Sequence, residues 1–583
     1  MRKVKIVCTM GPTCSSPEML REMTKAGMNV ARFNFSHGDR EWHLRMLSLV
    51  RQVEKELQVP IAALLDTKGP EIRTGKVQGG SALLEQGALV TFTTEDILGN
   101  SSRVTVNYPG LPSEVSPGQE IFADDGTLHF RVEKISGRDV ICRVVVGGLL
   151  RDTKGVNIPG GALSLPALSE KDLEDIRWGV ANDMEYIAVS FVRCRNDILE
   201  VRKIMEEAGG RMKVIAKIET REAVGNIGEI ADVVDGMMVA RGDLGVEIPT
   251  EDVPLEQKRI IDICRAKGKA VIVATQMLDS MIRNPRPTRA EASDVANAVL
   301  DGADAVMLSG ETANGAYPLR AVETMSRIVS KAEEGIEAWQ RPFRGPAETM
   351  GVPDAVSSAA VLVARQLDAA AIVSMTTSGS TARMVSKHRP PCPVLAATPS
   401  MRTWRELALY WGVTPILRDE MKDRNSAVDS ALASCLAAGL LREGDLAVVT
   451  AGVPFGTTGT TNMLQVHITG RILLKGLPLL KKDAGGEVCL ARTSREALEK
   501  MRPGAVLVVG ASDREYLPAM KLASAVIAEE GGLTSHAAVV SLELGIPCIV
   551  NAKGALALLR DGMTVTVDGY AGILYMGNVK LSA

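Results

Sequence analysis

Short apolar runs alternate with amphipathic segments through the first part of the chain. The runs at 4–9, 28–33 and 61–65 predict buried strands, and apolar positions at helical spacing predict a helix over 39–57. Because strands and helices alternate strictly here, we expect the strands to form a parallel sheet.

The pattern changes between about residues 71 and 166. This stretch has short β-branched runs separated by Gly, Pro and Asn, and it is far longer than an ordinary strand-to-helix connection. It therefore predicts a small β-barrel domain inserted into the first domain. The clearest of its predicted strands are 88–93, 102–106, 120–123 and 140–146.

The alternation resumes after residue 166. Ser169 with Asp172, and Thr288 with Glu291, have the spacing of capping boxes and predict two helix starts. Five further strands are predicted, at 186–189, 214–218, 236–240, 270–274 and 305–308. With the first three they make eight parallel units, which predicts a closed (β/α)8 TIM barrel, a fold of about 250 residues. An open doubly wound sheet is the alternative.

A polar, proline-containing connection near 340–354 leads to a second α/β unit, and the last segment has strand–turn–helix signals of its own. The strands of the second unit are predicted at 371–375, 394–397, 413–417 and 446–450. We therefore expect a catalytic barrel (1–70 and 167–340), an inserted β-domain (71–166), an α/β domain (341–470) and a C-terminal α/β domain (471–583).

Composition and charge limit the possible partners. The chain has 583 residues, too many for one core, and a net charge of −3, which gives no basic field for nucleic acid or an anionic membrane. Small molecules and further copies of the chain are the expected partners. The nine cysteines are scattered and never in CxxC spacing, which favours a reducing compartment. With no apolar run of signal-peptide or membrane-spanning length, we expect a cytoplasmic protein.

Polar residues gather where the predicted barrel strands end, which is where barrels of this type place reactive groups. Lys217 and Glu219 are two apart on one strand and therefore share a face. A structural ion pair would explain that pair alone, but similar groups follow nearly every strand. They are Arg32, Asn34, Ser36, His37, Asp66, Thr67, Glu71, Arg73, Arg241, Gly242, Asp243, Thr275, Gln276, Ser309, Gly310 and Glu311.

The residue types point to phosphoryl transfer. Three basic groups (Arg32, Arg73 and Lys217) suit an anionic, phosphorylated substrate, and two carboxylates (Glu219 and Asp243) suit Mg²⁺ or Mn²⁺. Cations and a metal around a moving phosphoryl group are what that reaction requires. Hard oxygen ligands suitable for a monovalent cation are offered by Asn34, Ser36, Asp66 and Thr67.

Six stretches together resemble the pyruvate kinase family, in the family's order and over about residues 1–470. They are Asn-Val-Ala-Arg-Phe-Asn-Phe-Ser-His-Gly (29–38), Leu-Asp-Thr-Lys-Gly-Pro-Glu-Ile-Arg-Thr-Gly (65–75), Ile-Ala-Lys-Ile-Glu (215–219), Met-Val-Ala-Arg-Gly-Asp-Leu-Gly (238–245), Ala-Thr-Gln-Met-Leu (274–278) and Met-Leu-Ser-Gly-Glu-Thr-Ala (307–313). The resemblance implies transfer of a phosphoryl group from phosphoenolpyruvate to ADP, giving pyruvate and ATP, in a homotetramer.

The resemblance also implies roles for individual residues. Lys217, Arg73 and Thr275 would be catalytic, with water near Thr275 protonating the enolate, and Glu219 and Asp243 would hold Mg²⁺ or Mn²⁺. Phosphoenolpyruvate would meet Arg32, Lys217, Gly242, Asp243 and Thr275. The nucleotide would meet Asn34, Phe35, Ser36, His37, Arg73 and Lys154. A potassium ion would be bound by Asn34, Ser36, Asp66 and Thr67.

Glu71 allows a finer expectation. Members of the family with Glu after Lys-Gly-Pro generally need K⁺, whereas those with Lys there do not, and an ammonium at that place could supply the missing charge. Since this chain has Glu71, we predict activation by K⁺.

Two loops of the 341–470 unit, 376–381 and 452–461, are rich in Ser, Thr and Gly. Such loops are often simple turns, but bare amides and hydroxyls at a helix start also bind phosphate. Both loops match the family's effector site, so we predict a phosphorylated allosteric effector. Its expected contacts are Thr376, Thr377, Ser378, Gly379, Ser380 and Thr381.

The last segment resembles another family. Residues 531–540 and 544–548 are similar to the phosphohistidine domain of phosphoenolpyruvate synthase and pyruvate phosphate dikinase, with His536 at the position of the phosphorylated histidine. Because the ATP-binding domain of those enzymes is missing, we favour an inert packing module over an active phosphocarrier.

Two other functions remain as alternatives. A dikinase-like phosphohistidine enzyme would depend on phosphate or AMP rather than on ADP alone. A non-catalytic metabolite sensor would keep only the effector loops, and the intact set of Lys217, Glu219, Asp243, Arg73 and Thr275 argues against it.

Overall fold

The computed structural model describes residues 2–160, 164–335, 351–418, 424–454, 459–470 and 472–579. Most of the predicted connection near 340–354 and residues 455–458 of the second effector loop lie outside this part of the chain. The chain divides into two compact units, Met1–Thr349 with Ser400–Pro415, and Met350–Pro399 with Ile416–Ala583.

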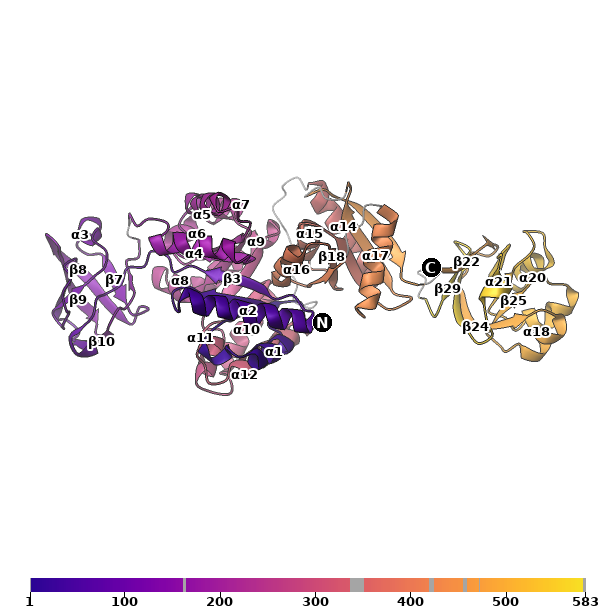
Figure 1. Ribbon diagram of the computed structural model, residues 1–583, viewed down its shortest axis with the longest axis horizontal. Coiled ribbons are helices and arrows are strands. Elements are labelled where there is room, and N and C mark those ends of the chain that lie inside the picture. The colour runs from indigo at the N-terminus through magenta and orange to yellow at the C-terminus, as the bar shows by residue number, and fades with distance from the viewer. Residues whose placement is uncertain are drawn as a thin grey trace. The chain divides into compact units, whose positions relative to one another are not determined.

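Eight parallel strands form a closed barrel in the first unit, in the order β1-β16-β15-β14-β13-β12-β3-β2. Figure 1 shows the helices that surround this barrel. The pairing of β1 with β16, from Lys5↔Ala305 to Cys8↔Leu308, closes the cylinder and excludes the open sheet. The strands are β1 Lys5–Thr9, β2 Val30–Asn34, β3 Ala62–Asp66, β12 Tyr186–Val189, β13 Lys213–Ile218, β14 Gly236–Ala240, β15 Ala270–Ala274 and β16 Ala305–Leu308.

Helices surround the barrel, and their apolar faces pack against the strands. Both predicted capping boxes are present, with Ser169 and Thr288 as N-caps. The helices are α1 Pro17–Ala26, α2 Arg40–Leu57, α4 Glu170–Ala181, α5 Arg195–Glu207, α6 Arg221–Gly225, α7 Ile227–Val233, α8 Arg241–Glu247, α9 Val253–Ala266, α10 Arg289–Asp301, α11 Gly310–Ala313 and α12 Pro318–Glu334, with short 3-10 turns η1 Pro12–Cys14 and η3 Asp279–Ile282.

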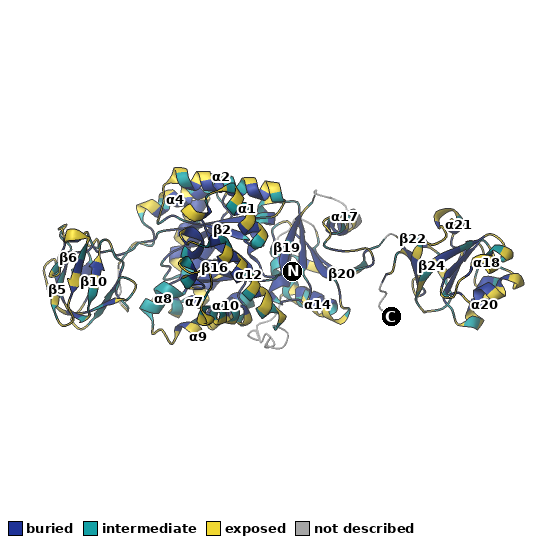
Figure 2. Ribbon diagram, turned by 90° about the horizontal axis from the view of Figure 1, so that it is seen from below, coloured by how far each residue is buried: buried dark blue, intermediate teal, exposed yellow. Residues whose placement is uncertain are grey.

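The barrel strands are the most buried part of this unit, and the helices expose only their outer faces (Figure 2). In β13, Val214, Ala216 and Ile218 belong to the core between strands and helices. Since strand side chains alternate, Lys217 points to the opposite side, into the barrel. The strand pattern therefore fixes the direction of this side chain.

The inserted segment forms a six-stranded sheet, β11-β7-β8-β9-β5-β6, and a two-stranded sheet, β10-β4. It has its own core, in which the rings of Phe92 and Phe130 meet edge to face at 5.0 Å. Its elements are η2 Gln78–Gly80, β4 Ser81–Leu84, β5 Leu89–Thr93, β6 Arg103–Thr105, α3 Leu111–Glu114, β7 Glu120–Ala123, β8 Leu128–Ser136, β9 Asp139–Val146, β10 Gly148–Arg151 and β11 Val156–Asn157.

A five-stranded sheet, β19-β18-β17-β20-β21, follows in the chain. Its edge strand β21 is antiparallel to β20 and was not predicted from the sequence. The elements are α14 Val352–Gln366, β17 Ala371–Met375, α15 Ser380–Lys387, β18 Val394–Thr398, α16 Met401–Glu406, η4 Leu407–Leu409, β19 Val413–Leu417, α17 Arg424–Ala437, β20 Leu446–Gly452 and β21 Thr461–Ile468.

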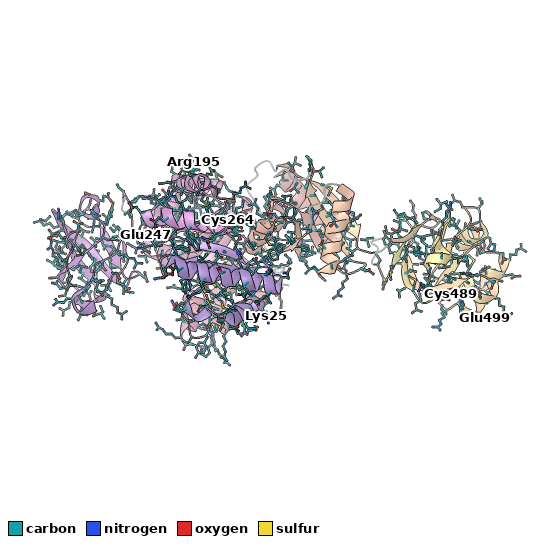
Figure 3. All side chains as sticks on the ribbon, in the orientation of Figure 1. Lys25, Arg195, Glu247, Cys264, Cys489 and Glu499 are labelled. Carbon is teal, nitrogen blue, oxygen red and sulfur yellow. The ribbon has the colours of Figure 1, made fainter. Side chains whose placement is uncertain are left out.

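The last segment contains an eight-stranded sheet, β22-β29-β28-β24-β25-β26-β27-β23. The elements are β22 Ile472–Lys475, β23 Leu477–Pro478, β24 Ala484–Ala491, α18 Ser494–Lys500, β25 Val506–Val509, η5 Arg514–Tyr516, α19 Leu517–Met520, β26 Ala525–Ala528, α20 His536–Leu544, β27 Cys548–Val550, α21 Ala555–Leu558, β28 Thr564–Asp568 and β29 Ile573–Met576. Among the described residues the nine cysteines form no disulfide bond; Figure 3 labels Cys264 and Cys489.

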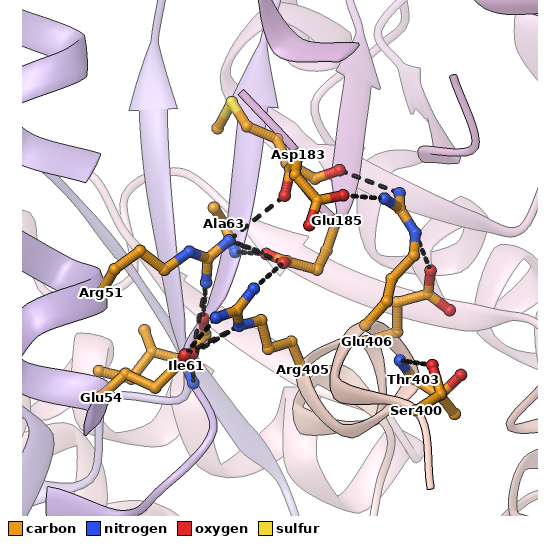
Figure 4. A network of polar contacts seen from close by, with 12 residues as sticks. Arg51, Glu54, Ile61, Ala63, Asp183, Glu185, Ser400, Thr403, Arg405 and Glu406 are labelled. Atoms are coloured by element: carbon orange, nitrogen blue, oxygen red, sulfur yellow. Dashed lines mark hydrogen bonds and ion pairs between the residues drawn. The ribbon is translucent and has the colours of Figure 1, made fainter. Parts of the chain in front are cut away.

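Helix α16 packs on the barrel, although it lies between two strands of the five-stranded sheet in sequence. Figure 4 shows the ion pairs that attach it. Arg405 Nη2 lies 2.7 Å from Glu54 Oε1, and its Nη1 lies 3.7 Å from Glu185 Oε1. Glu185 also pairs with Arg51 at 2.7 Å and accepts a hydrogen bond from the backbone N–H of Ala63. Both carboxylates are buried, so these contacts join α16 firmly to the barrel.

Candidate active site

Lys217 occupies the mouth of the barrel at the end of β13. Its Nζ lies 2.7 Å from Glu219 Oε1 and 3.3 Å from Asp66 Oδ1, and it donates a hydrogen bond to Ser190 Oγ at 2.8 Å. Burial alone would lower the pKa of Lys217, but the carboxylates of Asp66 and Glu219 raise it well above its usual range. The ammonium is therefore a permanent positive charge at this rim.

Glu219 is almost completely buried beside Lys217. Its Oε2 accepts a hydrogen bond from the backbone N–H of Phe191 at 2.7 Å. Its Oε1 forms the ion pair with Lys217, and this oxygen accepts no hydrogen bond of good geometry from the described residues. Burial raises the pKa of Glu219, Lys217 opposes that shift, and Asp243 adds to it.

Asp243 lies in the first turn of α8, directly after β14. Burial raises the pKa of its carboxyl; Lys217 lowers it, and the acidic groups of Asp125, Glu71 and Asp66 raise it further. Two carboxylates that repel each other, Glu219 buried with an oxygen that accepts no hydrogen bond and Asp243 half-buried, fit a divalent cation with few protein ligands. Within the described residues no group of three or more His, Cys, Asp or Glu side chains could hold a metal.

Asp66 connects Lys217 with Arg32. Arg32 Nε lies 2.6 Å from Asp66 Oδ2, and Arg32 Nη1 donates to Thr9 Oγ1 at 2.9 Å. Burial alone would raise the pKa of Asp66, but the two cations outweigh it and lower the pKa. Arg32, Asp66 and Lys217 thus form one buried network at the end of three strands.

The oxygens predicted to bind K⁺ lie at the neighbouring ends of β2 and β3, where Asn34 and Asp66 are register partners. Asn34 Oδ1 accepts from Ser36 N at 3.1 Å, and Thr67 Oγ1 accepts from Ser190 N at 3.1 Å. Asp66 is already paired with two cations, so it offers a K⁺ ion less charge than a free carboxylate would.

The predicted nucleotide residues are divided between the barrel and the inserted domain. The ring of Phe35 is buried and stacks on His43 at 4.1 Å, and the His37 carbonyl bonds the His43 ring. Phe35 can therefore contribute to a nucleotide site only through its backbone. Asn34 ends β2, and Phe35–His37 lie in the turn between β2 and α2.

Arg73 and Lys154 lie on the two connections to the inserted domain, which are joined by the bridge Arg73↔Gly155. Arg73 Nε lies 2.5 Å from Glu71 Oε2, and Lys154 Nζ lies 2.7 Å from Asp124 Oδ1. Both cations are part-exposed and paired with acidic groups, away from the contacts of Lys217.

Thr275 follows β15 in a left-handed turn, with φ of 66° at Thr275 and 54° at Gln276. Gly242 N donates to Thr275 Oγ1 at 2.8 Å, and the hydroxyl donates to Ala274 O at 2.7 Å. The start of α8 and the turn after β15 are thereby joined beside Asp243.

Three residues of this rim were not predicted as site residues. Ser190 and Phe191 follow β12 and bond Lys217 and Glu219, and Thr9 ends β1 and bonds Arg32. The signal was present, since the Val189-Ser190 boundary puts a hydroxyl directly after a buried strand. Glu311 has a supporting place: its carboxylate accepts from Leu278 N and Ser309 N and holds two neighbouring loops.

The effector loops predicted in the second unit come together at their described ends. Thr461 Oγ1 donates to Thr381 Oγ1 at 2.9 Å, and Thr376 N bonds Ala397 O at the end of β18. Gly379 has a φ of 79°, a conformation that favours glycine, and is the N-cap of α15. Ser380 is the first residue of that helix.

His536 is the first residue of α20 in the last segment. Its Nδ1 forms a hydrogen bond of 3.0 Å with Ser512 Oγ, and the ring is half-buried.

Comparison with known proteins places this geometry in a family. The family model described as "Pyruvate kinase, barrel domain" matches residues 1–322, and "Pyruvate kinase, alpha/beta domain" matches 354–467. The chain belongs to the pyruvate kinase family. Pyruvate kinases from Geobacillus stearothermophilus and Bacillus licheniformis are each 46% identical to it over the full length of both chains. One from Staphylococcus aureus is 43% identical over 99% of both chains.

Membership of the pyruvate kinase family makes the chain a phosphotransferase. The last segment is also identified, because residues 501–572 match the family model "PEP-utilising enzyme, mobile domain". None of the helices in the described residues combines the length and the apolar character that crossing a bilayer requires.

Proposed function

We propose that the barrel transfers the phosphoryl group of phosphoenolpyruvate to ADP, giving pyruvate and ATP. The observation that carries this proposal is the position of Lys217 Nζ, 2.7 Å from Glu219 and 3.3 Å from Asp66 at one rim of a closed barrel. A fixed cation beside carboxylates that suit Mg²⁺ is the arrangement that stabilises a phosphoryl group in transfer.

Each residue at the rim has a proposed role. The Lys217 ammonium stabilises charge on the phosphoryl oxygens during transfer, and Arg32 binds the phosphate of phosphoenolpyruvate. Glu219 and Asp243 would hold Mg²⁺ or Mn²⁺, which supplies a positive charge to the phosphoryl and enolate oxygens. Gly242 and Asp243 would contact the rest of the substrate.

The hydrogen bonds of Thr275 support water as the proton donor to the enolate. Gly242 N can only donate and Ala274 O can only accept, so the Thr275 hydroxyl donates its single proton to Ala274 O. Its remaining lone pair can accept from a water molecule but cannot protonate carbon. A water held there can donate its other proton to the enolate.

The nucleotide would lie between the barrel and the inserted domain, near Arg73, Lys154 and the Asn34–His37 turn. Both cations are part-exposed, and each can exchange its acidic partner, Glu71 for Arg73 and Asp124 for Lys154, for phosphate oxygens. A K⁺ ion would take oxygens of Asn34, Ser36, Asp66 and Thr67.

Further parts of the proposal rest on the family. We expect a cytoplasmic homotetramer with the domain boundaries given above and a phosphorylated effector at loop 376–381. The C-terminal domain serves as an inert packing module in this proposal.

A Ser380→Asp change tests the effector site. It should abolish activation by AMP and hexose phosphates and leave the unactivated rate unchanged, whereas Ser430→Asp on α17 should preserve activation.

A coupled assay for pyruvate tests the main proposal. The full chain should form pyruvate from phosphoenolpyruvate with ADP and Mg²⁺, without added phosphate. Turnover that requires AMP with pyrophosphate would instead support a dikinase-like enzyme. Absence of turnover with every nucleotide, in protein that still binds an effector, would support a metabolite sensor.

A further inference from the structure

We infer that Arg241 is a positioning residue, which holds the turn after β15 so that the Thr275 hydroxyl reaches Gly242 and the bound substrate. This inference rests on the proposed function, because Thr275 matters only if phosphoenolpyruvate is turned over at this rim. Arg241 is the first residue of α8 and directly precedes Gly242 and Asp243.

The turn after β15 requires stabilising contacts from outside the turn. Thr275 and Gln276 are consecutive residues with positive φ, 66° and 54°. This region is uncommon for residues other than glycine, and for a β-branched residue it is an outlier. Such a conformation is costly and persists only where neighbouring groups enforce it.

The Arg241 guanidinium supplies these contacts. Its Nη2 donates to Thr275 O at 2.8 Å, and its Nε donates to Ala274 O at 3.3 Å. One planar group thus fixes the orientation of two successive peptide carbonyls at the strained turn. A lysine has a single ammonium and cannot reproduce this fork.

Asp294 on α10 fixes Arg241 in turn. Its Oδ1 lies 2.6 Å from Arg241 Nη1, whereas Thr275 O accepts from Nη2. The Arg241 side chain is 14% exposed and also contacts Met277 Sδ. The contacts of the guanidinium are with the turn after β15 and with α10. We therefore infer that Arg241 affects the substrate through Thr275 and does not touch it.

The same turn decides where the Thr275 hydroxyl lies. The hydroxyl bonds Gly242 N and Ala274 O, and Ala274 O also accepts from Arg241. If the turn relaxes, the hydroxyl leaves Gly242, and the amide that follows Arg241 loses its acceptor. A displacement of about 1 Å at a reacting centre can cost a factor of about 100 in rate.

The chain offers a matched control at the other end of β14. Arg202 Nε donates to Val233 O at 2.9 Å, and its Nη2 lies 2.9 Å from Asp235 Oδ2. This arginine, on α5, has the same kind of partners, a backbone carbonyl and an aspartate, but both partners precede β14, at the opposite end of that strand from Gly242 and Asp243.

The test is a double-mutant cycle in the full-length protein, with kcat and the KM for phosphoenolpyruvate measured for R241K, T275A, the double variant and R202K. We expect R241K to lower kcat about 10- to 100-fold. In the T275A background the same change should lower kcat less than about threefold, because the group through which it acts is gone. R202K should keep kcat within about twofold of the wild type.

The outcomes separate this inference from the proposed function. If the wild type forms no pyruvate, the proposed function fails. If the wild type turns over and T275A retains full turnover, the role of Thr275 fails, and the inference about Arg241 fails with it. If T275A is impaired but R241K is not, or if the two effects multiply fully, only the role of Arg241 fails. Should R241K not fold, D294N replaces it in the same cycle, and the same loss of additivity is expected.

Discussion

Asp66 Oδ1 lies 3.3 Å from Lys217 Nζ, within the buried network at the barrel rim. The other oxygen of Asp66 is paired with Arg32 at 2.6 Å, so a single carboxylate keeps the two cations Lys217 and Arg32 in place. This carboxylate offers a K⁺ ion little free charge, and its main contribution is to fix Lys217.

Asp66→Asn should therefore lower kcat on the order of 100-fold, because the amide keeps the shape but loses the charge that orients both cations. The KM for phosphoenolpyruvate should rise as well, through Arg32. Steady-state kinetics over a series of K⁺ concentrations make the measurement. Restoration of full turnover by high K⁺ would mean that Asp66 serves mainly as a ligand of that ion.

Glu71→Lys tests the requirement for K⁺. The wild type, assayed with tetramethylammonium as the only monovalent cation, should be strongly impaired and regain turnover when K⁺ is added. The variant places an ammonium where Glu71 pairs with Arg73 at 2.5 Å, and its turnover should not depend on K⁺. Undiminished turnover of the wild type in tetramethylammonium would contradict the prediction.

Lys5 at the start of β1 should make stability depend on pH. Its Nζ is buried and donates to Val413 O at 2.7 Å, and burial, with a smaller contribution from Arg2, lowers its pKa from 10.5 to about 7. Between about pH 7 and 10.5 the unfolded chain binds more protons than the folded one, so this group makes stability rise with pH.

Lys5→Met removes the contribution of Lys5 to the pH dependence of stability. Calorimetric Tm values of the variant relative to the wild type should be highest near pH 7 and below, and the difference should shrink as the pH rises. Lys203→Met, an exposed change on α5, controls for loss of a charge. A difference between Lys5→Met and wild type that does not vary with pH would show that Lys5 is not held neutral by the fold.

Arg405→Met should destabilise the barrel by about 3 kcal/mol, because it leaves two buried carboxylates, Glu54 and Glu185, with fewer partners. Urea unfolding followed by circular dichroism measures the change. Arg495→Met removes an exposed pair with Glu499 and should change stability by less than about 0.5 kcal/mol. Equal effects of the two changes would mean that the α16 contacts add no stability.

The strands could be predicted well because each is a short apolar run of the right length. The sequence pattern ends the second strand at Phe33, because Asn34 is polar. In the structure the backbone of Asn34 continues the pairing of β2 with β3, since strand pairing does not depend on the polarity of the side chain. The edge strand β21 escaped prediction because only Thr461 and Met463 of its eight residues are buried, so no continuous apolar run marks it in the sequence.

The residues at the rim could be predicted from the sequence, but which of them pair with each other could not. The sequence identifies Lys217 and Glu219 as neighbours, because they share one strand. It does not show that Asp66 rather than Asp243 lies within an ion-pair distance of Lys217, because that depends on barrel register. The packing of α16 on the barrel was also hidden, since nothing in residues 400–415 distinguishes this helix from those that cover the five-stranded sheet.

The most direct test of the account is turnover of Lys217→Met, with Lys213→Met at the other end of β13 as the matched control. We predict that Lys217→Met loses at least a factor of about 1,000 in kcat while still binding Mn²⁺, measured by electron paramagnetic resonance, and that Lys213→Met stays within about threefold of the wild type. If folded Lys217→Met retained more than about a tenth of wild-type turnover, the cation at this rim would not be the group that stabilises the moving phosphoryl.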